Sequence, residues 1–354
     1  MKKRFGKLAM LLLLVGGMAL AVMAGAAQAN DSSTDGYLFN GGFEGNFYPV
    51  GDGQVAEGWV RVNLDGNPDW MSTCAFAEAG PNCDQGWVER IEGENSHILF
   101  SEELGAGQPF ETVLYQQVSG LTPGKSYSFS GWVLKMWGGP ANQFPPTDPY
   151  AYGSWIGIDP TGGTDPEAAS VLWGEIEWQE EAHGHFENHR LAAVAQDETV
   201  TVFVRVWHKW QKAGTQAIVD GLELFDAPTA TLHTPAGPLA EPYLDWSGTL
   251  PQSLRERGAF ELFFEVQKRD GERWVTLVDD LTDDRVPLPL VEGETVQLRV
   301  VPYSEQVDDP GRFTWPPSTH VGIPTAAITV TYDTAAPTEP QPPLHYLFLP
   351  IIPR

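Results

Sequence analysis

Tryptophan and planar polar side chains recur on one face of several alternating segments in the first two thirds of the chain. Trp132, Trp155 and Trp207 each fall opposite a run of apolar residues, Arg205 shares the face of Trp207, and Gln116 or Gln117 could join it. Pyranose rings stack their apolar C–H faces on indoles, and their hydroxyl groups need polar partners of these kinds. These residues indicate a carbohydrate-binding site, with the alternative that the tryptophans pack structurally.

Catalysis and zinc binding have weaker support. The candidate residues are four histidines and a nearby acidic run: His183, His185, His189 and His208, and Glu175, Glu177, Glu180 and Glu181. Zinc hydrolases carry H-E-x-x-H on a helix, whereas HGHFENH (183–189) alternates like a strand. A paired-carboxylate glycosidase needs a catalytic scaffold, and an acidic run is typical of a solvated face. The sequence has no G-x-S-x-G elbow either, so we expect a non-catalytic protein.

The stretch 112–137 must position several of these side chains, and its pattern predicts strand, turn, strand. Its first half alternates apolar and polar residues, and its second half places Trp132 on a face otherwise made of serines. Between them, Pro123 and Gly124 occupy the two central positions of a turn, which is typical of type II. We therefore expect a hairpin of an antiparallel sandwich with one face toward water.

Short alternating segments also dominate the rest of the chain. The segment 154–159 points two isoleucines inward and Trp155 outward, and 200–210 places valines opposite Arg205 and Trp207. Clusters of Gly, Pro, Asn and Asp separate these segments, and helical periodicity is scarce. This pattern predicts an all-β protein built from sandwiches.

Three segments resemble the galactose-binding-like jelly-roll family of carbohydrate-binding modules. QQVSGLTPGKSYSFSGWV (116–133) is similar to the central hairpin of that family, and LFNGGFE (38–44) to its opening strand. AIVDGLEL (217–224) resembles the closing strand, with Gly221 where a second Asp is common. The resemblance covers roughly residues 36–227 and implies a jelly-roll β-sandwich that binds carbohydrate.

The same resemblance implies a structural calcium ion at the edge of the sandwich. Its carboxylate ligands would be Glu44 of the opening strand and Asp220 of the closing strand, together with backbone carbonyl groups. Ca²⁺ takes six to eight oxygen ligands, which two segments distant in sequence can supply together. The alternative is that both are ordinary exposed acids.

A different unit is expected from Pro228 to Asp333. The run 265–274 followed by 296–300 resembles fibronectin type III and related immunoglobulin-like modules, which implies a second, smaller sandwich. Residues 334–343 are rich in Pro, Thr and Ala, so they predict an extended linker. The apolar tail HYLFLPIIPR (345–354) is similar to short attachment signals of bacterial secreted proteins, with an edge strand as the alternative.

The N-terminus has the pattern of a secretory signal peptide. A basic start, an apolar core over 8–22 and the small-residue site Ala27-Gln28-Ala29 predict cleavage after residue 29, with a retained membrane anchor as the alternative. No other segment is apolar enough to span a membrane. The formal net charge of −26 argues against nucleic acid and anionic membranes as partners, since both are bound through basic patches.

The chain has two cysteines, Cys74 and Cys83, which in a secreted protein most simply form a disulfide. Free thiols or a metal pair are the alternatives. Taken together, the residues predict a secreted, non-catalytic protein that binds a poly- or oligosaccharide and could be attached to the cell surface through its tail. A structural or adhesive protein with a protein partner, and a polysaccharide-active enzyme on a sandwich scaffold, remain as alternatives.

Overall fold

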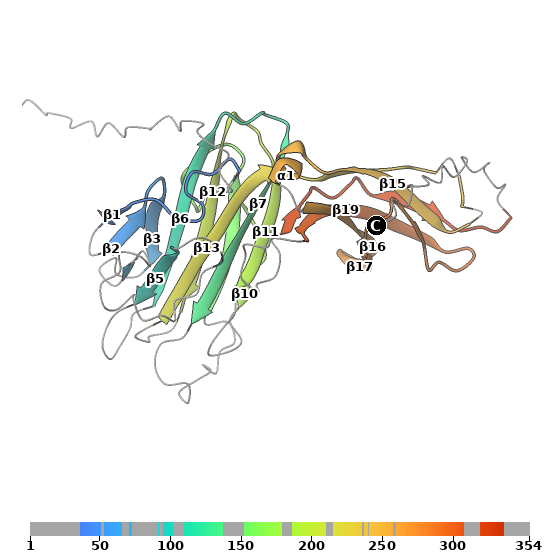
Figure 1. Cartoon of the computed structure of the whole chain (residues 1–354). Helices are drawn as coiled ribbons and strands as arrows, with labels where there is room; N and C mark the ends of the chain where they lie inside the picture. The colour runs from blue at the N-terminus through green and yellow to red at the C-terminus, as the bar shows by residue number, and fades with distance from the viewer. Residues whose placement is uncertain are drawn as a thin grey trace, which may run out of the picture.

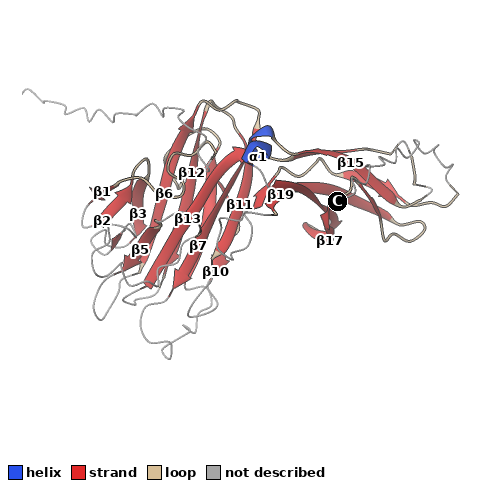
Figure 2. Cartoon of the chain, in the orientation of Figure 1, coloured by secondary structure: helices blue, strands red, loops and turns tan. Residues whose placement is uncertain are grey.

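The computed structural model describes residues 36–50, 53–65, 71–72, 91, 95–101, 109–136, 152–178, 186–209, 215–235, 237–239, 241–257, 260–307 and 319–335. Within these residues the chain forms 21 strands and one short helix, α1 (Gln252–Arg257). Figure 2 shows the strands gathered in two bodies with α1 between them. The all-β class and the sandwich architecture are therefore confirmed.

The first sandwich consists of two antiparallel sheets (Figure 1). The β12 sheet contains, in spatial order, β10 (Glu177–Trp178), β8 (Tyr152–Asp159), β12 (Thr199–His208), β6 (Phe110–Ser119) and β3 (Val60–Asp65), with β9 (Leu172–Trp173) also on β8. The β13 sheet contains β11 (Glu187–Val194), β7 (Ser126–Met136), β13 (Thr215–Asp226), β5 (His97–Ser101) and β4 (Met71–Ser72). The strands β1 (Phe47–Val50) and β2 (Gly53–Ala56) form a separate hairpin.

The hairpin expected over 112–137 is wrong, because β6 and β7 lie in different sheets. The turn between them does form: Lys125 N donates to the Thr122 carbonyl at 3.1 Å, and Gly124 has a φ of +82°. β6 pairs with β12 and β3, whereas β7 pairs with β13 and β11. The chain crosses between the layers because the apolar residues of both strands face each other across one core.

That core follows the expected alternation. Ile156 and Ile158 of β8 and three valines of β12, at positions 202, 204 and 206, are buried between the sheets. Each such side chain contributes about 1.5–3 kcal/mol when it is removed from water. The side chains between them in sequence consequently point away from the core, onto the outer face of the β12 sheet.

The second sandwich is smaller. One sheet contains β14 (Thr229–Leu232), β15 (Tyr243–Thr249) and β18 (Arg285–Pro287). The other contains β17 (Arg273–Leu281), β16 (Phe260–Asp270), β19 (Thr295–Gln306) and β20 (Thr319–Val321), with β21 (Ile328–Thr331) also on β19. Trp246, Val266 and Leu298 are central to its core.

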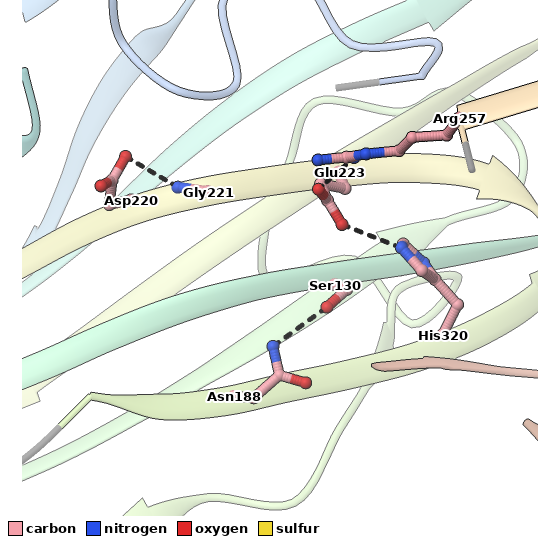
Figure 3. Close-up of polar contacts among 7 residues, drawn as sticks. All are labelled: Ser130, Asn188, Asp220, Gly221, Glu223, Arg257 and His320. Carbon is pink, nitrogen blue, oxygen red and sulfur yellow. Dashed lines mark hydrogen bonds and ion pairs between the residues drawn. The ribbon is translucent and has the colours of Figure 1, made fainter. Parts of the chain in front are cut away.

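A buried polar cluster joins the two sandwiches. Glu223 of β13 forms an ion pair with Arg257 of α1 and a hydrogen bond with His320 of β20, and Figure 3 shows its carboxylate between those two side chains. The ring of His320 also packs edge-on against Phe225, with 5.1 Å between centroids. A bulge after Asp220 precedes this contact in the strand. The outer face of the β13 sheet is thus partly covered by the second sandwich.

Several expectations lie outside the described residues: the segment 1–29, Cys74 and Cys83, and the tail from 336 onward. Of the helices in the described part of the chain, none is long and apolar enough to cross a membrane.

Candidate functional site

Four of the six tryptophans described in the first sandwich lie on the outer face of the β12 sheet. Strand register arranges them in rows across the sheet. The rows are Glu111–Trp207–Gly153–Trp178, then Arg205–Trp155, then Phe203–Gly157–Trp173. Together with Lys209, which follows β12, we call Trp155, Trp173, Trp178, Arg205 and Trp207 the aromatic face.

Two glycines of β8 make room for the indoles. A Cβ atom on Gly157 would lie 2.7 Å from Cε3 of Trp173, and one on Gly153 would lie 3.0 Å from Cε3 of Trp178. Real Cβ contacts are longer than this, so each indole lies directly over a backbone that carries no side chain. The alternation Gly153, Trp155, Gly157 in β8 therefore allows two rings from neighbouring segments to lie on the sheet.

Trp178 and Trp207 form the more accessible part of the aromatic face. Both are partly exposed, their ring centroids are 6.3 Å apart, and their planes are inclined by 49°. Nζ of Lys209 lies 4.0 Å from the ring centroid of Trp207 and 4.5 Å from that of Trp178. Both rings therefore make cation–π contacts with one ammonium group.

Arg205 organises the other part. Its Nε donates to Oε1 of Glu111 at 2.8 Å, and its guanidinium also lies 5.0 Å from the ring of Trp155 and 5.4 Å from that of Trp173. Trp155 is buried, with 5% of its surface exposed, because Trp173 packs edge-on against it. The expected exposure of Trp155 is therefore wrong, and its ring instead positions Arg205. Trp173 remains partly exposed.

Two other residues that were expected to bind sugar, Trp132 and Gln116, are instead buried and hold the fold together. Trp132 points to the outer face of the β13 sheet as expected, but it is only 1% exposed. It is enclosed by apolar side chains: Ile91, Ile98, Leu134, Phe186 and Ile218. Gln116 faces inward, where its amide bonds both backbone groups of Phe39 at 2.8 Å, and it does not join Arg205. The expectation that Trp132 and Gln116 contact a sugar is therefore wrong for both residues.

Each of the two expected calcium ligands accepts a backbone N–H from a residue that precedes β5. Oε1 of Glu44 accepts the N–H of Asn95 at 2.8 Å, and Oδ2 of Asp220 accepts the N–H of Ile91 at 2.5 Å. Asp220 is fully buried, whereas Glu44 is exposed. Their carboxylates are hard oxygen donors of the type that Ca²⁺ prefers. Within the described residues, no group of three or more His, Cys, Asp or Glu side chains could hold a metal ion.

A polar cluster inside the first sandwich has the composition of a catalytic site but not its accessibility. Nζ of Lys135 donates to Oγ of Ser154 at 2.9 Å and pairs with Glu187, and Ser154 Oγ lies 2.9 Å from Nε2 of His189. Burial lowers the pKa of Lys135, with Glu187 opposing this shift. Burial and the charge of Lys135 together lower the pKa of His189 to about 3. Ser154 is fully buried, so its hydroxyl group serves to satisfy Lys135 and His189.

Sequence reasoning missed Trp173, Trp178 and Glu111 as members or neighbours of the aromatic face, and it assigned no binding role to Lys209. Trp173 and Trp178 follow a turn-rich segment and belong to strands of two residues, which are too short to show alternation. The spacing of Gly153, Trp155 and Gly157 was an available signal, since glycine at alternate positions of a strand marks a close approach from outside.

No protein-family profile matches this chain, and no curated protein is similar to it in sequence. Solved structures are similar in part. The carbohydrate-binding module TmCBM61, in complex with β-1,4-galactotriose, shares 18% identity over 54% of this chain and 98% of the module, with a TM-score of 0.33. The K1 cleaved adhesin domain of Lys-gingipain from Porphyromonas gingivalis W83 shares 14% identity over 52% of this chain and 95% of the domain, with a TM-score of 0.33.

The CBM22-1–CBM22-2 tandem domain from Paenibacillus barcinonensis Xyn10C shares 9% identity over 83% of this chain and 92% of the tandem domain, with a TM-score of 0.28. All three TM-scores are below 0.5, so the function of this chain has to be inferred from its own residues.

Proposed function

We propose that the first sandwich is a non-catalytic saccharide-binding module and that its ligand stacks on the aromatic face. The observation that carries this proposal is the pair of partly exposed indoles, Trp178 and Trp207, with 6.3 Å between their ring centroids. Two inclined rings at this spacing offer neighbouring platforms for the C–H faces of sugar units. Arg205, held by Glu111, and Lys209 supply polar groups beside them.

The rings are preformed for binding. Trp178 lies over Gly153, and Trp207 is the cross-strand neighbour of the same glycine, so both are fixed by the β12 sheet rather than by a long loop. Side chains that are already ordered lose little conformational entropy when a ligand binds. Binding then needs no covalent step.

The rival proposal is a structural or adhesive protein. The burial of Trp132 and Trp155 favours it, because those two indoles pack within the protein and cannot stack on a sugar. It differs in what the aromatic face contacts: a protein partner instead of a glycan. We expect Trp207→Ala and Trp178→Ala each to weaken glycan binding about five- to tenfold, because a lost stacking contact removes of order 1–1.5 kcal/mol.

The experiment is calorimetry and affinity electrophoresis of the full chain against a panel of neutral and acidic polysaccharides. Trp274→Ala is the matched control, because Trp274 also lies beneath a cation, Arg299, but belongs to the second sandwich. Retention of the wild type and of this control, with loss in the two aromatic-face variants, supports the proposal. Absence of binding to every glycan tested contradicts it and leaves the adhesive alternative.

We further propose that Ca²⁺ is held by Glu44 and Asp220 with backbone carbonyl groups of the adjoining loop. The Gly41 carbonyl already accepts the N–H of Leu222 at 3.1 Å, so this loop lies against the strand of Asp220. The ion would be structural and would link the loop to β13.

Secretion, the disulfide between Cys74 and Cys83, and attachment through the tail also remain proposals, supported by the sequence patterns described above. Mass spectrometry of the exported protein tests all three.

A further inference from the structure

The lysine of the aromatic face is an exception among the lysines that the structure describes. Four lysines lie in the described residues, and three form ion pairs: Lys125 with Asp226, Lys135 with Glu187 and Lys268 with Glu294. The fourth, Lys209, has no carboxylate within ion-pair distance among the described residues, and its contacts are the rings of Trp178 and Trp207. A cation with no anionic partner among the residues that the structure describes thus lies at the proposed saccharide site.

Two described carboxylates in the same row of the sheet, Glu111 and Asp65, do not neutralise Lys209. Glu111 is paired with Arg205 through both Nε and a terminal nitrogen. Asp65 lies beyond Glu111 in the same row, two strands away from Trp207, which is about 10 Å at the usual strand spacing. At physiological ionic strength an exposed charge at that distance is largely screened.

The position of the ammonium group decides which ligands the two indoles accept. A neutral sugar that stacks on both rings has to displace Nζ of Lys209 from them and gains no charge partner. An anionic sugar that stacks also has to move Nζ from the ring faces, but its negative charge can then pair with the ammonium group. A charge-assisted hydrogen bond is stronger than a cation–π contact at a partly exposed site.

We propose that the ligand of the aromatic face is an acidic saccharide, whose carboxylate or sulfate group pairs with Lys209 while its pyranose rings stack on Trp178 and Trp207. This inference rests on the proposed function and names the ligand class for the same site. Uronate and sulfate ester share the required chemistry, and the two arms of the experiment distinguish them.

The test compares an acidic oligosaccharide with a neutral derivative of the same sugar backbone. Calorimetry of the full chain uses short oligogalacturonates against the same oligomers as methyl esters, and κ-carrageenan oligosaccharides against the same oligosaccharides after desulfation. We expect the acidic member of one pair to bind about tenfold or more tightly than its neutral counterpart, and this ratio to fall toward one in Lys209→Gln. Lys268→Gln, which alters a lysine of the second sandwich, should keep the ratio.

Tighter binding of a neutral oligosaccharide, or equal affinity within both pairs, overturns the acidic-ligand inference while leaving saccharide binding intact. An acidic preference that persists in Lys209→Gln also overturns it, because another group of the protein then binds the anionic group of the saccharide. Absence of binding to all four oligosaccharides and to the neutral panel contradicts both this inference and the proposed function.

Discussion

Oε2 of Glu223 in the first sandwich lies 2.9 Å from Nε2 of His320 in the second, and both side chains are fully buried. Arg257 of α1 pairs with the other carboxylate oxygen of Glu223. One carboxylate therefore contacts both the connecting helix and the second sandwich (Figure 3). Because a buried charge is costly without its partners, this contact favours one relative arrangement of the two sandwiches.

Removal of this carboxylate should weaken the junction. Glu223→Ala leaves Arg257 and His320 without their shared anion, and loss of one partner of a buried pair costs about 3–5 kcal/mol. We expect a lower melting temperature in differential scanning calorimetry and separation of one transition into two. Glu261→Gln, an exposed acid of β16, is the control. An unchanged single transition in Glu223→Ala would show that the junction does not depend on this cluster.

A methyl group beneath an indole should disturb the aromatic face from below. Gly153→Ala places Cβ 2.8 Å from Cγ2 of Ile176 and 3.0 Å from Trp178, so the indole has to move. Overpacking of this kind costs about 1–3 kcal/mol, and we expect glycan affinity to fall about tenfold as the ring shifts. Gly237→Ala, where a Cβ meets nothing within 4 Å, is the control. Wild-type affinity in Gly153→Ala would argue against Trp178 as a contact.

Acid should destabilise the first sandwich through buried neutral histidines. Burial lowers the pKa of His208 from 6.5 to about 3, and its ring lies between Phe110 and Tyr152. The unfolded chain therefore binds a proton between pH 6.5 and about 3 that the folded chain does not. Stability is fully present above pH 6.5 and falls as the pH decreases, by about 1.4 kcal/mol per pH unit for one such group.

His208→Phe keeps an aromatic ring and removes the titration, so its stability should decline less steeply below pH 6 in urea denaturation series. His233→Gln is the control, since His233 is half exposed. If His208→Phe and the wild type lose stability in parallel from pH 6.5 to 4, this explanation of acid sensitivity is incorrect.

Calcium should stabilise the first sandwich if the proposed site exists. A ligand that binds only the folded state at 100 times its dissociation constant adds about 2.7 kcal/mol. We expect chelator to lower the melting temperature at fixed pH, and Asp220→Asn to abolish the response to added Ca²⁺. Asp165→Asn, an exposed turn acid, should respond as the wild type does. A melting temperature insensitive to both chelator and Ca²⁺ would exclude the site.

The alternation of side chains was enough to predict the all-β class and the faces of β8 and β12, because alternation is a local property of a strand. The valines of β12 and the isoleucines of β8 are buried as expected, and Trp155, Arg205 and Trp207 point outward. The turn at Pro123 and Gly124 could also be predicted, since it depends on the backbone preferences of adjacent residues.

Only the tertiary structure decided which outward side chains remain accessible and which strands are neighbours. Trp132 is outward but covered by residues far away in sequence, and β6 and β7 are adjacent in sequence but belong to different layers. The pairing of Trp178 with Trp207, and of Lys209 with both, likewise brings together residues from separate strands. A periodic pattern specifies the direction of a side chain, whereas its burial depends on what the rest of the chain places over it.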